Sequence, residues 1–419
     1  MIDKITFAGT SSPSWPKAAR ALSKLAGVKV SMMEVSRITQ QIGQELLENR
    51  EREAALHQRR ELPTSTTQPL EIACVPVDGG RIRTRLAGQG PGVQDQVCKE
   101  TKVAALWRMV GSTFDHDPHP EPPRCFLDQK HVPQRVRAIK RQRSEQHQRD
   151  DEQAEKTSSK QPHTPTQDST KSERKWPPRR VFRTCVATLK DVHGFGPLVA
   201  AEAQRRGFYD AARQVFLGDG DHKNWTVHKL HFPHFTAITD FVHPVTYLYD
   251  AAAAVTSSWA AQWEQYTEWL IACWGGRVST VLDELHAWQQ RLGLPEKETP
   301  ENDPRQVVAK TLTYLTNNQQ RMNYPQYRQQ GLPITSCLVE SLIKEINDRV
   351  KGTEQFWNRP EALQAESILQ TTACLLSDGD PLTKHILSRP GFLYYRRSTR
   401  ANPHNAPRPY KRRRKKECC

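Results

Sequence analysis

The sequence lacks any stretch approaching about 18 consecutive apolar residues, the length that a membrane-spanning helix requires, so no membrane partner is expected. Its N-terminus, MIDKITFAGTSSPSWPKAAR, lacks the basic segment followed by an apolar segment that marks a secretory signal peptide. Its nine cysteines are odd in number and form no Cys-x-x-Cys pair. These absences argue against a disulfide framework or a zinc knuckle and favour an intracellular protein with reduced thiols.

Positive charge is distributed unevenly along the chain, whose formal net charge is +15. Residues 130–180 hold 14 Lys and Arg against 7 Asp and Glu, and residues 396–419 hold 10 Lys and Arg against Glu417 alone. The rest of the chain is therefore close to neutral. Segmental charge of this kind indicates basic arms that contact a polyanion, rather than a uniformly basic globule.

Two amphipathic segments lie near the N-terminus. Apolar residues at helical spacing predict one helix around residues 18–25 and a second around 35–46, with Gly27 between them and Ser31 as the N-cap of the second. Such a pair could be a helix-turn-helix that places its second helix on DNA. The alternative is a plain helical hairpin used for packing or dimerisation.

Three strands are expected between residues 70 and 111. Residues 72–77 predict the first, Asp78-Gly79-Gly80 a tight turn, and the alternating RIRTR segment the second. KVAALWRMVG, residues 102–111, predicts the third. The sequence thus predicts an antiparallel meander with Asp78 at the end of its first strand.

The remaining chain alternates between polar and ordered segments. Residues 112–180 are rich in Pro and charge, and their second half is typical of a disordered insertion. Residues 181–242 predict strand, helix, strand, helix and strand, the pattern of parallel pairing. Residues 246–330 predict helices throughout, and a later amphipathic helix ends at Gly352.

Three carboxylates stand where an RNase H-like core needs them. Such a core has one Asp on its first strand, another just after its fourth and a third carboxylate on a late helix; Asp78, Asp219 and Glu340 occupy those places. Three converging carboxylates suit two Mg²⁺ ions, which prefer hard oxygen ligands. Asp221 is the main rival of Asp219, and an acidic turn without function is the alternative for both.

Glu340 also begins a polar face on its predicted helix. Glu340, Lys344, Asn347 and Lys351 recur at spacings of four, three and four, so they share one side. Lys344 and Lys351 could bind DNA phosphates beside the carboxylate. The alternative is a solvated helix face with salt bridges.

Several blocks, taken in order, resemble the bacterial insertion-sequence transposases of the DDE type that are related to the mutator-like superfamily. The blocks cover about residues 1–110 and 181–390, whereas the 112–180 insertion and the basic tail lie largely outside them. They are VPVDGGRIRTR, VFLGDGDHKNW, TDFVH followed by YLYDAA, NNQQRMNYPQYRQQGLPITSCLVESLIKEINDRVKG, and FWNRPEALQAESIL.

The resemblance implies a catalytic triad and a reaction. Asp78, Asp219 and Glu340 would bind two Mg²⁺ or Mn²⁺ ions. Water would free a 3′-hydroxyl at the element end, and that hydroxyl would attack target DNA. Asp240 and His243 are similar to the family's Cys/Asp-x-x-His signature after the fifth strand, and they are expected to support the site or orient a phosphate.

The resulting prediction is an α/β protein with an RNase H-like mixed sheet, a large all-helical insertion and an N-terminal helical region. The expected partners are transposon-end and target DNA and further copies of the chain, with no small-molecule substrate, in a bacterial nucleoid-associated cytoplasmic setting. The alternatives are a catalytically inactive DNA-binding relic or repressor, and a related nuclease that does not join DNA.

The expected parts are an N-terminal helical region (1–69), a first core segment with strands 1–3 (70–111), the Pro-rich basic insertion (112–180), a second core segment (181–245), the helical insertion (246–330), the catalytic Glu helix with the helices that follow it (331–390) and the basic tail (391–419).

Overall fold

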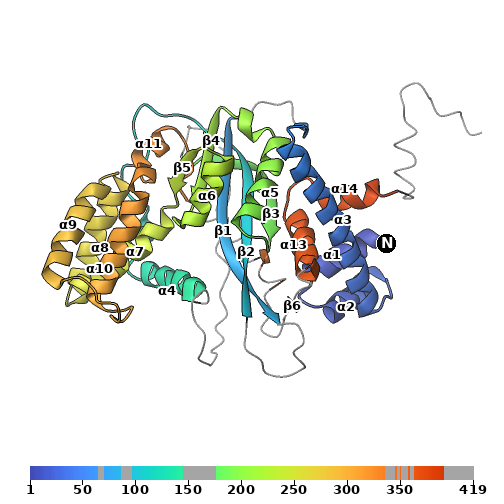
Figure 1. The fold of residues 1–419 in the computed structure, drawn as a ribbon, viewed down its shortest axis with the longest axis horizontal. Coiled ribbons are helices and arrows are strands. Elements are labelled where there is room, and N and C mark those ends of the chain that lie inside the picture. The colour runs from blue at the N-terminus through green and yellow to red at the C-terminus, as the bar shows by residue number, and fades with distance from the viewer. Residues whose placement is uncertain are drawn as a thin grey trace, which may run out of the picture.

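A mixed β-sheet forms the centre of the computed structural model, with helices on both of its faces (Figure 1). The structure describes residues 1–64, 70–85, 97–144, 176–335, 345–346, 350, 357–358 and 363–390. The strand order is β3-β2-β1-β4-β5, and β6 pairs with the far end of β1. β2 runs antiparallel to its two neighbours β1 and β3, whereas β4 and β5 run parallel to β1. The strands are β1 (Ile72–Arg85), β2 (Val97–Val110), β3 (Arg179–Thr188), β4 (Arg213–Gly218), β5 (Thr236–Thr239) and β6 (Trp357–Asn358).

The tight turn predicted at Asp78-Gly79-Gly80 is wrong, because β1 continues straight through these residues. Gly79 lies opposite Lys102 on β2, and a Cβ at Gly79 would stand 3.3 Å from the Thr101 carbonyl oxygen. The glycine therefore permits a close approach of two strands rather than a reversal. An antiparallel meander does form, but its third strand is β3, after the 112–178 segment, and residues 102–110 belong to the second strand.

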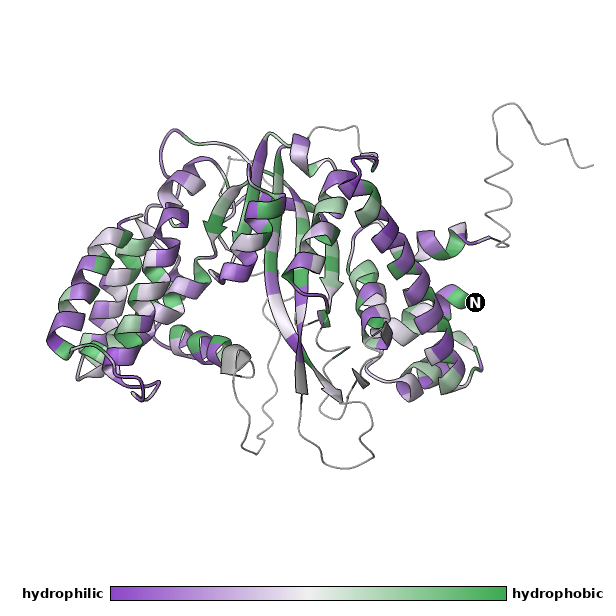
Figure 2. Ribbon diagram, viewed as in Figure 1, coloured by the Kyte–Doolittle hydropathy of each residue, from purple (hydrophilic) through white to green (hydrophobic). Residues whose placement is uncertain are grey.

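The sheet is buried on both faces, as the alternation of β1 shows. Ile72, Cys74 and Ile82 pack into one hydrophobic core, whereas Ala73 and Val75 pack into the other. Successive strand residues point to opposite faces, so a strand covered on both sides is a continuous apolar run. Figure 2 shows hydrophobic residues along the central strands, and both hydrophobic and hydrophilic stripes on the outer helices. One face is covered by α5 (Val192–Arg205) and α6 (His222–His231), with the short η2 (Phe208–Asp210) between them.

A helical region packs beside the other face of the sheet, at the left in Figure 1. Trp269 and Trp274 are each 1% exposed and form part of its core. The indole of Trp274 also lies 4.2 Å beneath the guanidinium of Arg328. The elements are α7 (Val242–Val255), α8 (Trp259–Trp274), α9 (Val278–Leu292), α10 (Pro304–Asn318), η3 (Gln319–Arg321) and α11 (Tyr324–Gln329).

Part of the 112–180 segment is ordered and packed. It contains η1 (Arg124–Phe126) and α4 (His131–Ser144), and Val132, Val136 and Ile139 of α4 enter the core beside α7. The first half of the segment therefore belongs to the fold. The disorder predicted for its second half falls mostly on residues 145–175, which lie outside the described residues.

The predicted N-terminal helix pair is present and packs onto the core. α2 (Trp15–Ala26) ends at Gly27, whose φ is 65°, and Ser31 Oγ caps α3 (Met32–Gln58) by accepting from the Glu34 N–H. α1 (Ile2–Ser11) precedes the pair and was not predicted. α3 buries residues along its length against α5, α13 (Leu363–Leu375) and α14 (Pro381–Ser388). The packing role of the hairpin is thus visible, and its binding to DNA stays a prediction.

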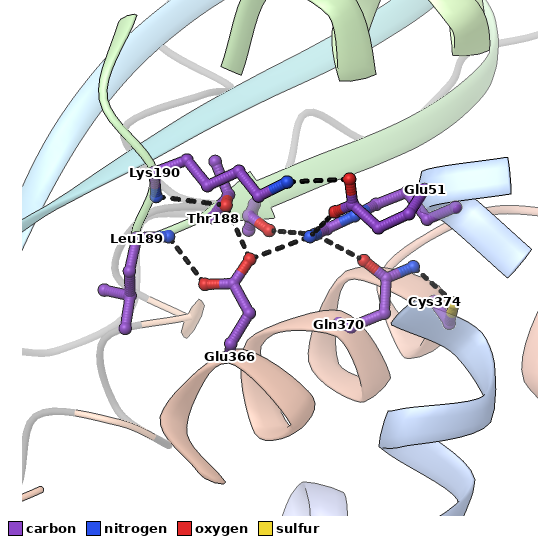
Figure 3. Close-up of polar contacts among 9 residues, drawn as sticks. Glu51, Thr188, Leu189, Lys190, Glu366, Gln370 and Cys374 are labelled. Carbon is purple, nitrogen blue, oxygen red and sulfur yellow. Dashed lines mark hydrogen bonds and ion pairs between the residues drawn. The ribbon is translucent and has the colours of Figure 1, made fainter. Parts of the chain in front are cut away.

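A buried polar network fastens α3 to α13 and to the end of β3. Arg50 Nη2 donates to Glu366 Oε1 at 2.9 Å, and the same carboxylate accepts from the Leu189 N–H at 2.7 Å and from Thr188 Oγ1. Figure 3 shows Glu366 reaching from its helix toward Thr188 and Leu189, with Gln370 beside it. Because the side chains of Arg50 and Glu366 are only 9% and 11% exposed, the pair is largely withdrawn from water.

Candidate active site

Asp78 and Asp219 lie side by side at the same level of the sheet. β1 and β4 pair in parallel register as far as Pro76 and Leu217, and the two aspartates each stand two residues beyond that pair. Neighbouring strands are roughly 4.8 Å apart. Both residues line one cavity of about 140 Å³. The structure therefore brings together two of the three carboxylates that the sequence singled out, although 141 positions separate them along the chain.

The carboxylate of Asp219 is held in place by the start of α6. Its Oδ1 accepts from Asn224 Nδ2 at 2.8 Å and from the Asp221 N–H at 2.9 Å. Within the described part of the chain, no hydrogen bond or ion pair involves Oδ2. The side chain is half-buried. One oxygen is thus used to orient the carboxylate.

Asp221 has a different task. It is the N-cap of α6, and its Oδ1 accepts from the Lys223 N–H at 2.8 Å and lies 3.2 Å from His222 Nδ1. Its side chain is 44% exposed. An N-cap carboxylate satisfies backbone N–H groups that have no partner within the helix. The geometry therefore favours Asp219 over Asp221 as the second site carboxylate.

Asp240 is buried and does not line the cavity of Asp78 and Asp219. It follows β5, has no exposed surface, and donates its N–H to the Gly218 carbonyl at 2.8 Å while its Oδ1 accepts from the Val242 N–H. Burial raises the pKa of the neighbouring Cys74 thiol, and the charge of Asp240 raises it further. His243, 8% exposed, stands in the first turn of α7. Asp240 is fully buried in this conformation, and its role in supporting the site or orienting a phosphate stays a prediction.

Charged side chains that the sequence analysis did not single out complete the wall of the cavity. Glu100 accepts from Lys102 at 3.0 Å and from Lys223 at 3.1 Å. Burial acts to raise the pKa of Glu100, but the hydrogen bonds and charges of the two lysines outweigh it, and the pKa is lowered. Arg81 faces Glu100 across β1 and β2 and lines the same cavity. Alternation on β2 places Glu100 and Lys102 on one face, but the contact of Glu100 with Lys223 of α6 is apparent only in the folded chain.

The third predicted carboxylate, Glu340, lies outside the described residues, as do Lys344 and Lys351. Among the residues that the structure does describe, no three His, Cys, Asp or Glu side chains come together as a group that could hold a metal ion. Asp78 and Asp219 supply two oxygen ligands of the kind that Mg²⁺ and Mn²⁺ prefer. They fit one side of such a site, which a further carboxylate would have to complete.

Across the described helices, none is both long enough and apolar enough to cross a bilayer.

No protein-family model matches the chain, and no curated protein matches its sequence. Membership of the family that its sequence blocks resemble is therefore a proposal.

Proposed function

We propose that this chain is a DDE-type transposase that cleaves the ends of an insertion sequence and joins the freed 3′-hydroxyl to target DNA. The observation that carries the proposal is the placement of Asp78 on the first strand and Asp219 directly after the fourth, in register and on one cavity. The strand order and directions support an RNase H-like core, in which an antiparallel meander is followed by parallel strands alternating with helices. Both basic segments and the sequence blocks are in keeping with a DNA substrate.

The residues of the site have separable tasks in this proposal. Asp78 and Asp219, with Glu340 as the third member, would hold two divalent cations. When bound, Mg²⁺ or Mn²⁺ would supply activation of the attacking oxygen and stabilisation of the leaving oxygen in an in-line phosphoryl transfer. Asn224 and the Asp221 N–H hold the Asp219 carboxylate in one orientation. Lys223 and Arg81 supply positive charge at the cavity wall, where a phosphate would lie.

The test is cleavage and joining by the purified full-length chain. The substrate is a supercoiled plasmid that carries the gene with its flanking DNA, incubated with Mn²⁺ or with Mg²⁺. We expect nicks at the element ends, followed by products in which those ends are joined to a second plasmid. Nicking without joining would instead identify a metal-dependent nuclease, and specific binding of the ends without nicking would identify a relic or repressor. Either result would overturn the proposal.

A further inference from the structure

A large groove opens beside the candidate site, between α6 and α10. Its volume is about 1080 Å³. Gly220 and Asp221, the residues that follow Asp219, form part of its lining, and Asp221 also lines the smaller cavity of Asp78 and Asp219. The groove therefore begins where the candidate site ends.

Positive charge dominates the groove. Lys229, Lys310 and Arg321 line it, whereas Asp221 is its one acidic lining residue among those described. Lys310 pairs with Glu301 at 3.2 Å, but Glu301 is 86% exposed, and such surface pairs are weak and readily exchanged. The carboxylate of Asp221 is engaged by the α6 N-terminus and by His222. The surplus of positive charge suits an anionic chain such as a phosphodiester backbone.

Aromatic rings lie among these charges. The guanidinium of Arg321 stands 4.4 Å from the centroid of the Trp225 ring. Tyr247 and Tyr314 stack with centroids 3.9 Å apart. Trp225, Tyr247 and Tyr314 all line the groove. Grooves that combine basic side chains with aromatic rings are typical of single-stranded nucleic-acid binding, since unpaired bases stack on the rings while phosphates meet the cations.

Hydrogen bonds and close packing connect the wall of the groove to the candidate site. Tyr314 Oη donates to the main-chain carbonyl of Asp219 at 3.0 Å, and Trp225 Nε1 donates to Asn318 Oδ1 at 3.1 Å. Gly220 has a φ of +99°, and a Cβ there would stand 2.6 Å from Tyr314 Cε2. Glycine thus allows α10 to lie against the loop that carries Asp219. Asp221, which lines both the groove and the cavity, marks the point where the two adjoin.

We propose that this groove binds an unpaired DNA strand next to the phosphate that reacts, with Lys229, Lys310 and Arg321 on its backbone and Trp225 and Tyr247 on its bases. The inference rests on the proposed function for the position of the reacting phosphate, but strand binding itself needs no catalysis. A duplex would hide its base faces from these rings, so the single strand is the preferred ligand.

The experiment measures binding without cleavage. A labelled single-stranded oligodeoxynucleotide and the corresponding duplex are titrated by fluorescence anisotropy, in EDTA, against the full chain carrying Asp219→Asn. The test variant adds Lys229→Ala and Lys310→Ala to this background. The matched control variant instead adds Lys297→Ala and Lys384→Ala, which remove two exposed lysines outside the groove. We expect the groove pair to weaken single-strand binding at least about tenfold, and to reduce the dependence of log K on log salt by about 1.4, for two lost phosphate contacts. The control should change affinity less than about twofold.

Equal losses in the groove pair and the control pair, or an unchanged affinity in the groove pair, would overturn the inference. A loss of duplex affinity in the groove pair as large as its loss of single-strand affinity would also overturn it. These outcomes are independent of the proposed function. A chain that cleaves and joins DNA but binds single strands equally well with and without the groove lysines refutes the groove alone. A chain that binds strands through the groove but never cleaves refutes the transposase alone.

Discussion

The hydroxyl of Tyr314 donates a 3.0 Å hydrogen bond to the main-chain carbonyl of Asp219. Tyr314 lies on α10, in the helical region, whereas Asp219 ends β4 of the sheet. The bond therefore anchors the loop that carries Asp219, the candidate metal ligand, and the anchoring residue lies on a helix 95 residues away along the chain. This contact makes the helical region part of the site rather than an appendage to the sheet.

Tyr314→Phe should lower strand cleavage by about tenfold, because the Asp219 loop loses one of its restraints while the ring stack remains. The expected loss of unfolding free energy is about 1 kcal/mol, the usual worth of one hydrogen bond. Tyr324→Phe is the matched control, since Tyr324 Oη donates to the Thr239 carbonyl at the same 3.0 Å on the neighbouring β5. Similar cleavage losses in both variants would show that Tyr314 acts only through stability.

Gly220→Ala should destabilise the chain by roughly 2–4 kcal/mol, because it combines a strained positive φ with a collision against Tyr314. Gly293→Ala separates the two effects. Gly293 also has a positive φ, of +84°, but a Cβ there would have nothing within 4 Å. Thermal or urea unfolding of both variants measures the difference. Equal destabilisation would contradict the close packing of α10 on the Asp219 loop.

Arg50→Met should cost about 3–5 kcal/mol of unfolding free energy, since it leaves the Glu366 carboxylate buried without its cation. Arg37→Met provides the comparison. Arg37 also pairs with a glutamate, Glu34, but the two side chains are 62% and 41% exposed, and such a solvated pair contributes little to stability. Urea denaturation at neutral pH compares them, and a cost for Arg50→Met no larger than that for Arg37→Met would contradict the buried network.

Asp117 should make the stability of the chain pH-dependent in acid. Burial acts to raise its pKa, but the hydrogen bond and charge of the fully buried Arg328 outweigh burial and lower it below the usual 3.8. A lowered folded-state pKa stabilises the fold above the unfolded-state value, and the contribution is lost as pH falls through the folded-state value. Asp117→Asn should therefore cost roughly 2–3 kcal/mol at pH 7. Urea denaturation near pH 3 should show a smaller cost, and an equal cost at both pH values would contradict this assignment.

Local pattern was enough to predict much of the fold. The apolar runs in residues 212–218 and 235–242 predict β4 and β5, although β5 itself ends at Thr239, and Ser31 identifies the start of α3. The Asp-Gly-Gly stretch was misread as a turn because its extended form depends on pairing with β2, which only the folded chain supplies. The sequence pattern does not predict α1, because its buried face includes Thr6, Gly9 and Thr10, so apolar residues do not recur there at helical spacing.

The candidate site was predictable only in part, for a similar reason. The neighbourhood of Asp78 and Asp219 follows from strand order, since residues at the same level of adjacent parallel strands lie together, although β1 runs on past Asp78 to Arg85. Glu100 and Lys102 could be placed on one face but not beside Lys223, because that contact joins β2 to α6. The apolar side chains Val132, Val136 and Ile139 recur at helical spacing and could have revealed α4, but the surrounding charge obscured them.

The central claim is that Asp78 and Asp219, rather than Asp221, are ligands of a two-metal phosphoryl-transfer site. The most direct measurement is cleavage and joining of element-end DNA in Mn²⁺ by Asp78→Asn, Asp219→Asn and Asp221→Asn, each first shown to unfold like the unaltered chain and to bind the same DNA. The first two variants should lose both reactions by at least about 10³-fold, while Asp221→Asn should keep most of its activity. Cleavage that persists in Asp78→Asn or Asp219→Asn, or that disappears only in Asp221→Asn, would contradict the claim.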